Sequence, residues 1–159
     1  MPVIEPSESI NLIGLDRSSL ERFFLELGES TYRATQLMKW IYHKGVGDFQ
    51  AMTDFSRDLR TRLDAIATLK MPLELSRDRS SDGTVRWVMQ TGNRNAVETV
   101  WIPDDGRNTL CISSQIGCVL DCSFCATGKQ GFNGNLSSSE IIGQVLHADR
   151  MLKEFWDPR

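Results

Sequence analysis

Three of the four cysteines in this chain lie within eight residues, at Cys118, Cys122 and Cys125. Three neighbouring thiols cannot all pair as disulfides with one another, because one sulfur is left over. Thiolates on so short a loop can instead share one soft metal centre, and they select zinc, Cu(I) or iron–sulfur clusters. A closed structural zinc site has four protein ligands. Three ligands therefore favour a four-iron cluster in which one iron stays open to another molecule.

A structural zinc site is the alternative that the same residues leave open. Cys111 lies seven residues before Cys118, and it or a histidine would then supply the fourth ligand. His43 and His147 have no partner histidine at a metal-binding spacing, so neither is assigned as a ligand. The C-x3-C-x2-C spacing favours the cluster over zinc.

The totals describe a chain of 159 residues with 40% hydrophobic residues, 25% charged residues and a net charge of −3. This composition is typical of one ordinary globular domain or two small ones. It does not by itself suggest a protein that binds nucleic acid. No apolar run approaches the ~20 residues of a membrane span, and no secretory signal is visible at the start. Clustered cysteines fit a reducing compartment, so we expect a cytoplasmic protein without a membrane partner.

Helical spacing of apolar residues predicts a small helical domain over residues 1–71. Its first helix is predicted to begin at Ser18, with Glu21 completing a capping box, and to end at Gly28. A second helix is predicted to end at His43, before Gly45, and a third to begin near Ser56.

Strand patterns begin at Pro72, so residues 72–159 are expected to form a second, α/β domain. Strands are predicted at 84–89, 96–102 and 109–113, with turns between them. The last strand is expected to lead directly into the cysteine loop. A helix is predicted to follow from Ser137, with Glu140 as its capping-box partner.

The spacing from Cys118 to Cys125 resembles the signature of radical S-adenosylmethionine enzymes. The surrounding sequence resembles one branch of them, the RNA adenine carbon-2 methyltransferases that act on large-subunit ribosomal RNA and tRNA. The matching segments are Met38–His43, Ser80–Thr84, Val97–Pro103, Thr109–Cys118 and Ser139–Val145. Members of this family are more than twice as long, so the chain is expected to be an N-terminal portion.

The resemblance implies a fold for each part of the chain. Residues 1–71 are expected to form a helix-hairpin-helix-like accessory domain that binds RNA. Residues 72–159 are expected to form a β-meander and then the first βα unit of a radical-enzyme (β/α) partial barrel, truncated after that unit.

The resemblance also assigns roles to the candidate site residues. Cys118, Cys122 and Cys125 would bind three irons of a [4Fe-4S] cluster, whose fourth iron would chelate S-adenosylmethionine and yield a 5′-deoxyadenosyl radical. Cys111 would resolve a covalent protein–RNA intermediate by forming a disulfide with a late cysteine that this chain lacks. Read from the residues alone, Cys111 is instead a small buried hydrophobe. Glu98 would accept a proton, although the strand pattern alone makes it simply an exposed side chain.

The expected activity is methylation of carbon 2 of adenine in 23S ribosomal RNA and tRNA, with a reducing electron donor. The full-length enzyme is expected to be a monomer. The family's Gly-Glu-Pro segment is absent, so this chain alone is expected to be inactive. Two alternatives remain open. One is the sibling family that methylates carbon 8 of the same adenine. The other is a zinc-bound RNA-binding module without catalysis.

Overall fold

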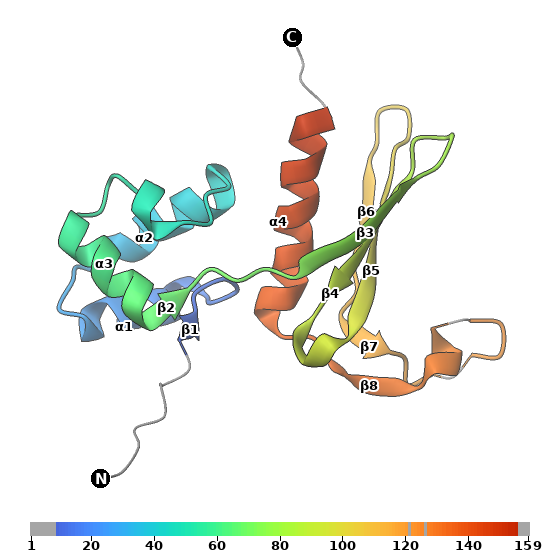
Figure 1. The fold of residues 1–159 in the computed structure, drawn as a ribbon, viewed down its shortest axis with the longest axis horizontal. Helices are drawn as coiled ribbons and strands as arrows, with labels where there is room; N and C mark the ends of the chain where they lie inside the picture. The colour runs from blue at the N-terminus through green and yellow to red at the C-terminus, as the bar shows by residue number, and fades with distance from the viewer. Residues whose placement is uncertain (1–8, 121, 126, 156–159) are drawn as a thin grey trace. The chain divides into compact units, whose positions relative to one another are not determined.

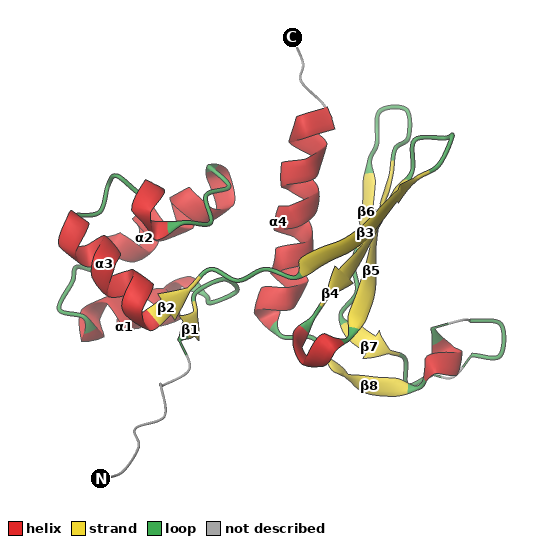
Figure 2. Ribbon diagram, viewed as in Figure 1, coloured by secondary structure: helices red, strands yellow, loops and turns green. Residues whose placement is uncertain are grey.

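The computed structural model describes residues 9–120, 122–125 and 127–155 (Figure 1). The chain divides into two compact units, the first ending at Lys70 and the second beginning at Met71. Figure 2 shows that the first unit is mainly helical and that the second combines strands with one long helix. Within the described ranges, no helix has the length and apolar character needed to cross a membrane.

From residue 9 onward, the first unit contains three α-helices and two very short strands. The helices are α1 (Arg17–Glu26), α2 (Tyr32–Met38) and α3 (Arg57–Ile66), with a π-helical turn η1 (Lys39–His43) after α2 and a 3-10 turn η2 (Phe49–Ala51) before α3. The strands β1 (Ile10–Asn11) and β2 (Ala67–Thr68) pair in parallel. This pairing joins the beginning of the unit to its end.

The helix starts follow from side chains that accept hydrogen bonds from free backbone N–H groups. The predicted Ser18 cap of α1 is wrong. Asp16 caps the helix instead, and its carboxylate accepts from the backbone N–H of Ser19 at 2.8 Å. Glu21 forms no capping box and accepts from Arg17 Nε at 2.8 Å. The predicted start of α3 near Ser56 is confirmed, and Ser56 Oγ caps the helix by accepting from Leu59 N–H at 3.2 Å.

The apolar faces of these helices meet in one core. Its most buried members include Leu12, Leu20, Phe24, Leu37, Met52, Phe55, Leu59 and Leu63. The rings of Phe24 and Phe55 lie 6.0 Å apart, centroid to centroid. Each such side chain contributes about 1.5–3 kcal/mol by leaving water, so this core can hold the unit together.

The second unit is built on an antiparallel sheet whose strands follow one another in sequence order. These strands are β3 (Leu73–Arg79), β4 (Val85–Gln90), β5 (Ala96–Ile102) and β6 (Thr109–Cys111), with the 3-10 turn η3 (Gly92–Arg94) between β4 and β5. Helix α4 (Ser138–Phe155) runs along one face of this sheet (Figure 1). Its predicted capping box is confirmed, because Glu140 Oε2 accepts from the Ser137 hydroxyl at 2.7 Å and from its N–H at 2.8 Å.

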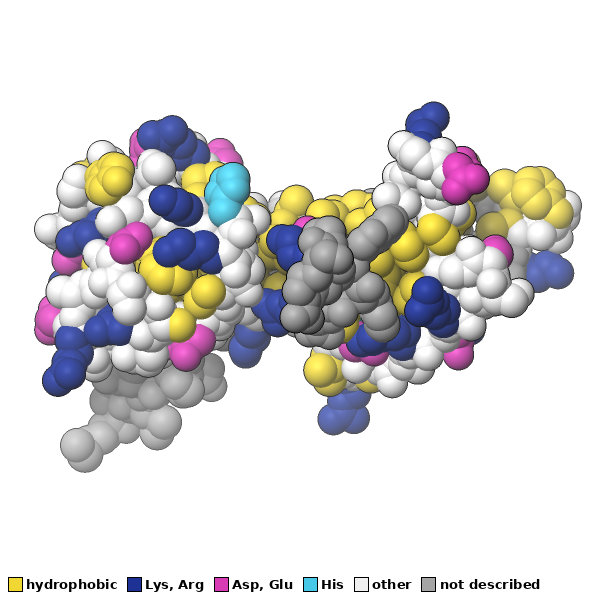
Figure 3. Space-filling view, turned by 90° about the horizontal axis from the view of Figure 1, so that it is seen from above, with side chains coloured by type: hydrophobic (Ala, Val, Ile, Leu, Met, Phe, Trp, Pro, Cys, Tyr) yellow, Lys and Arg dark blue, Asp and Glu magenta, His cyan; other side chains and the backbone are white. Residues whose placement is uncertain are grey.

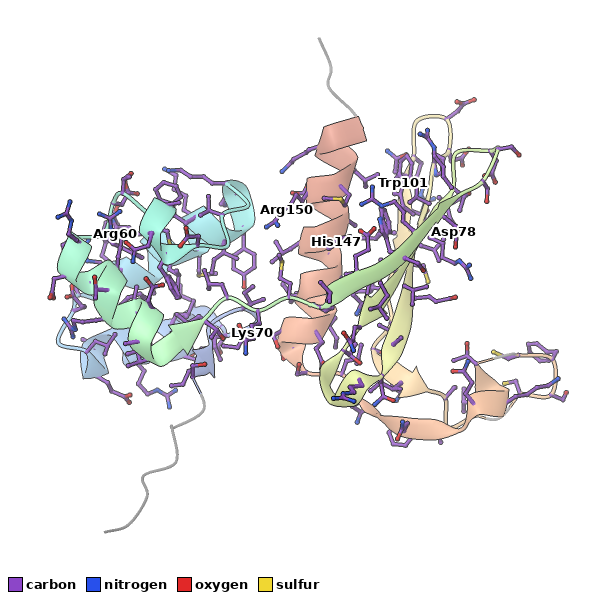
Figure 4. The ribbon with its side chains drawn as sticks, in the orientation of Figure 1. Arg60, Lys70, Asp78, Trp101, His147 and Arg150 are labelled. Atoms are coloured by element: carbon purple, nitrogen blue, oxygen red, sulfur yellow. The ribbon has the colours of Figure 1, made fainter. Side chains whose placement is uncertain are left out.

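Alternation along the strands decides which side chains face α4. Trp87 and Met89 of β4, together with Val97 and Trp101 of β5, are buried in the core under the helix. Figure 4 shows Trp101 and His147 in the layer between α4 and the sheet. The intervening residues lie on the opposite face of the sheet, which is mostly exposed.

The strand after the sheet differs from the prediction. The strand expected over 109–113 ends at Cys111 and does not lead directly into the cysteine loop. A separate antiparallel hairpin follows, formed by β7 (Gln115–Gly117) and β8 (Phe132–Asn135), and the cysteine loop lies between its strands together with the 3-10 turn η4 (Gly128–Gln130). Strands of three and four residues are too short to show a period in the sequence, so pairing across the hairpin is what defines them.

Candidate functional site

A hollow of about 480 Å³ lies beside the exposed face of the sheet, where β5 and β6 meet the hairpin. Glu98 of β5 and Cys111 of β6 both line it. Gly117 and Thr127, which flank the cysteine loop on its two sides, line it as well. The structure therefore gathers two of the predicted site residues and the base of the cysteine loop around one hollow. Its volume is within the range of small-molecule binding sites.

Glu98 is held in place by an arginine that sequence reasoning did not single out. Glu98 Oε1 accepts a hydrogen bond from Arg86 Nη1 at 2.9 Å. The other arm of Arg86 donates to Asp78 Oδ2 at 2.8 Å. The three charges form a row across β3, β4 and β5. Exposed pairs of this kind add little stability, but the planar guanidinium orients the Glu98 carboxylate.

Cys111 is exposed at the end of β6 and is paired in the ladder with Val100. Its interpretation as a small buried hydrophobe is therefore wrong. An exposed thiol beside a hollow is accessible to a reactant, whereas a thiol in a packed core is inert.

The three clustered cysteines lie between β7 and β8. Cys118 follows β7 directly, and its N–H donates to Gly131 O at 3.2 Å. Cys125 N–H donates to Cys122 O at 3.0 Å, forming a tight turn before η4. All four cysteines are free. In the part of the chain that the structure describes, no three side chains of His, Cys, Asp or Glu are gathered closely enough to hold a metal ion.

The chemistry of these donors nevertheless fits an iron–sulfur cluster. Backbone hydrogen bonds from Gly128 and Thr127, with a further one from the Thr127 hydroxyl, lower the pKa of the Cys125 thiol. A thiolate is the form of cysteine that binds metals, so these donors favour the form of Cys125 that a metal centre would need. Cys118, Cys122 and Cys125 are each partly exposed, and thiolates are the ligands that iron–sulfur clusters use.

Large apolar side chains are exposed on the same loop. Val119, Leu120 and Phe124 are 63%, 77% and 90% exposed. Exposed apolar groups concentrated in one place mark a surface that contacts another molecule or another part of a protein. The loop therefore combines soft ligands with an apolar contact surface.

The helical unit has a hollow of its own, of about 480 Å³. Arg17, Lys39 and His43 line it together with Thr35 and Met38. Across the face of this unit shown in Figure 3, Lys and Arg side chains lie among acidic ones and form no continuous basic patch. Two cationic side chains, Arg17 and Lys39, therefore line one hollow together with the apolar Met38.

Comparison with known proteins finds that the chain is similar to RNA methyltransferases. Residues 10–69 match a family model described as the N-terminal domain of ribosomal RNA large subunit methyltransferases. The dual-specificity RNA methyltransferase RlmN of Pseudomonas putida is 54% identical over 141 residues, which are 89% of this chain and 37% of that relative. RlmN of Pseudomonas fluorescens SBW25 is 55% identical over 140 residues, or 88% of this chain and 37% of the relative.

A solved structure of a methyltransferase is also similar to this chain. The crystal structure of a radical SAM methyltransferase from Sphaerobacter thermophilus matches with a TM-score of 0.84 and 33% sequence identity. The match covers 92% of this chain and 43% of that one. The chain thus shares a mixed α/β fold with a radical SAM methyltransferase and spans well under half the length of the relatives it matches.

Proposed function

We propose that this chain, which is similar to RlmN sequences and to a radical SAM methyltransferase, supplies the cluster-binding loop of such an enzyme. The proposed reaction is methylation of carbon 2 of adenine in 23S ribosomal RNA and tRNA. The names of the relatives support an RNA substrate of two kinds. The observation that carries the proposal is the cysteine loop, which begins and ends at a hollow lined by Glu98 and Cys111.

Cys118, Cys122 and Cys125 would hold a [4Fe-4S] cluster, with S-adenosylmethionine on its open iron. The bound group would supply the radical that starts methyl transfer. The chain's own contribution is to present three sulfurs on one loop and to favour the thiolate of Cys125 through the N–H groups of Gly128 and Thr127. A reducing electron donor is implied by this cofactor set.

Glu98 would accept the proton that leaves carbon 2 of the adenine, and Arg86 would keep its carboxylate turned toward the hollow. Cys111 would resolve the protein–RNA intermediate through its exposed thiol. Both residues line the hollow, which supports a shared substrate. We also infer that the β7–β8 hairpin and α4 belong to the first βα unit of the barrel, in a monomeric cytoplasmic enzyme.

The helical unit would contact the RNA outside the reacting base. Arg17 and Lys39 line one hollow beside His43, and two cationic side chains at such a place suit phosphate groups. The match of residues 10–69 to a ribosomal RNA methyltransferase domain supports this assignment. Its expected architecture is helix-hairpin-helix-like.

Anaerobic reconstitution with iron and sulfide tests the cluster. We expect about four irons and four sulfides per chain, with the brown colour of a [4Fe-4S] centre. Cys122→Ser should lose most of this iron. Cys111→Ser is the matched control, since it removes the remaining cysteine without touching the proposed ligands, and it should keep the cluster. Stoichiometric zinc without sulfide would overturn the proposal.

Binding to a ribosomal RNA hairpin, followed by fluorescence anisotropy at several salt concentrations, tests the RNA contact. Lys39→Glu should weaken binding. It should also reduce the slope of the logarithm of the binding constant against the logarithm of salt concentration by about one, as for the loss of one phosphate contact. Arg57→Glu makes the same charge change on α3, away from the residues that line the hollow, and should have a smaller effect. Equal losses for both variants would show that net charge, and not this hollow, governs binding.

A further inference from the structure

Gln144 is a fully buried polar residue on the side of α4 that packs against the sheet. Its amide makes four hydrogen bonds. The oxygen Oε1 accepts from Thr99 Oγ1 and from Ser113 N–H, both at 2.9 Å. The nitrogen Nε2 donates to Ser113 O at 2.9 Å and to Glu140 O at 3.1 Å. Every bonding position on the amide nitrogen and oxygen is therefore used.

Ser113 bonds to both the oxygen and the nitrogen of this amide, at the point where the chain leaves the sheet. The β5–β6 ladder pairs Val100 with Cys111 and ends there. Continuing the same register by two residues would place Ser113 opposite Glu98. The backbone N–H and C=O of Ser113 bond to Gln144, and the Ser113 hydroxyl donates to Glu98 O at 2.8 Å. The Gln144 amide thus makes the two backbone hydrogen bonds to Ser113 that a neighbouring strand would otherwise make.

The bonds from Gln144 to Ser113 influence both Cys111 and Glu98, which line the hollow. Cys111, Ser113 and Gln115 alternate along one segment, and all three line the hollow, as does Glu98. Fixing Ser113 therefore fixes the segment that carries Cys111. Through the Ser113 hydroxyl it also fixes the backbone of Glu98. Gln144 itself does not line the hollow.

We propose that Gln144 is a positioning residue that sets the placement of Cys111 relative to Glu98. The proposal rests on the proposed function only in giving these two residues a shared task. A glutamate at this position could not donate to Ser113 O and Glu140 O when ionised, and an apolar side chain would leave the Ser113 N–H and C=O unpaired. The specific requirement is an amide that both accepts and donates.

Gln144→Met keeps the length of the side chain and removes its hydrogen bonds. We expect the Ser113 amide to exchange hydrogen at least about tenfold faster, because its opening no longer breaks a buried bond. Alkylation of Cys111 by iodoacetamide should change at least about threefold, while Cys122 in the same molecule reacts as before. The chain is labelled intact and then digested, and mass spectrometry of its fragments reports both rates.

Gln144→Glu separates hydrogen bonding from packing. A protonated carboxyl group can accept from Ser113 N–H and donate to Ser113 O, whereas the ionised group can only accept. The protection of Ser113, corrected for intrinsic exchange, should therefore rise as pH falls in this variant and stay flat in the parent chain. Ionising a carboxyl group at this buried position would also weaken the whole fold, so the result that supports the proposal is a pH-dependent change at Ser113 larger than that of the β4 amides. An equal change at Ser113 and in β4 would overturn it.

Leu152→Ala is the matched control, since it loosens packing on the same helix without touching the amide's partners. It should lower stability and leave Ser113 protection and Cys111 reactivity unchanged. If Gln144→Met does not fold, Thr99→Val removes a single bond of the same network and should speed Ser113 exchange by about threefold. Parent-like values in the Gln144 variants, or the same changes in Leu152→Ala, would overturn the proposal. None of these readouts needs a cluster, RNA or turnover, so they remain interpretable if the proposed function fails.

Discussion

Gly117 occupies a backbone position that only glycine can fill at the base of the cysteine loop. Its φ is +71°, and a Cβ built on it would overlap the carbonyl oxygen of Gly131 across the hairpin. The same oxygen accepts from Cys118 N–H. We predict that Gly117→Ala separates β7 from β8 and lowers the free energy of unfolding by about 2–4 kcal/mol. The iron bound after reconstitution should fall with it, as measured by iron analysis beside a denaturant titration.

Gly106 provides the control for backbone conformation. Its φ is +80°, but no atom lies within 4 Å of where a Cβ would be. Gly106→Ala should therefore cost only the conformational penalty, about 1–2 kcal/mol, and leave iron binding intact. An equal effect of both substitutions would show that close packing against Gly131 is unimportant.

The reactivity of the Cys125 thiol should depend on pH in a way that reports its hydrogen bonds. Hydrogen bonds from the Gly128 and Thr127 backbones stabilise its thiolate and lower its pKa. Its alkylation rate should therefore reach a plateau at a lower pH than that of an unstructured cysteine peptide. Thr127→Val removes the hydroxyl contribution and should move the midpoint to higher pH. A midpoint that stays fixed in this variant would contradict the assignment of the hydroxyl.

Helix α4 depends on one carboxylate that joins two elements. Glu140 caps the helix through Ser137 and also accepts from Gly92 N–H of η3 through Oε1 at 2.7 Å. We predict that Glu140→Ala lowers the free energy of unfolding by about 2 kcal/mol, because a cap and a bond to a second backbone N–H are both lost. Chemical denaturation followed by circular dichroism measures this change.

Two further variants on α4 should each lose less stability than Glu140→Ala and serve as comparisons. Glu140→Gln keeps one acceptor oxygen, so its loss should be smaller. Asp149→Ala breaks only an exposed pair with Lys153 and should cost less than about 0.5 kcal/mol. A Glu140→Ala variant that is no less stable than Asp149→Ala would show that the cap does not support the helix.

Across the whole molecule, each unit has a buried core of its own. Leu63 is fully buried in the helical unit, and Met89 is fully buried in the sheet unit. Truncating either side chain to alanine should cost about 2–5 kcal/mol in the unit that contains it. We predict that Leu63→Ala speeds hydrogen exchange in α1–α3 but not in β4 and β5, and that Met89→Ala does the reverse. Exchange that rises throughout the chain in both variants would indicate one cooperative unit.

The sequence alone determined the features that depend on nearby residues. The start of α3 and the capping box of α4 could be predicted because Ser56 and Ser137 lie within three residues of the groups they bond. Alternation along β5 likewise placed Glu98 on the exposed face. The first cap was misread because Asp16 and Ser18 are both capable acceptors, and their geometry decides between them.

Only the tertiary structure decided what surrounds the cysteine loop. The hairpin strands are three and four residues long, and they exist because they pair with each other across the loop. The meeting of Glu98 with Cys111 and the bonds from Gln144 to Ser113 join residues that are far apart in the chain. Local preferences act over about one helical turn or one strand, whereas such contacts form only when whole elements pack. The cysteine spacing predicts iron–sulfur chemistry, and packing brings Glu98, Cys111 and the base of the cysteine loop to one hollow.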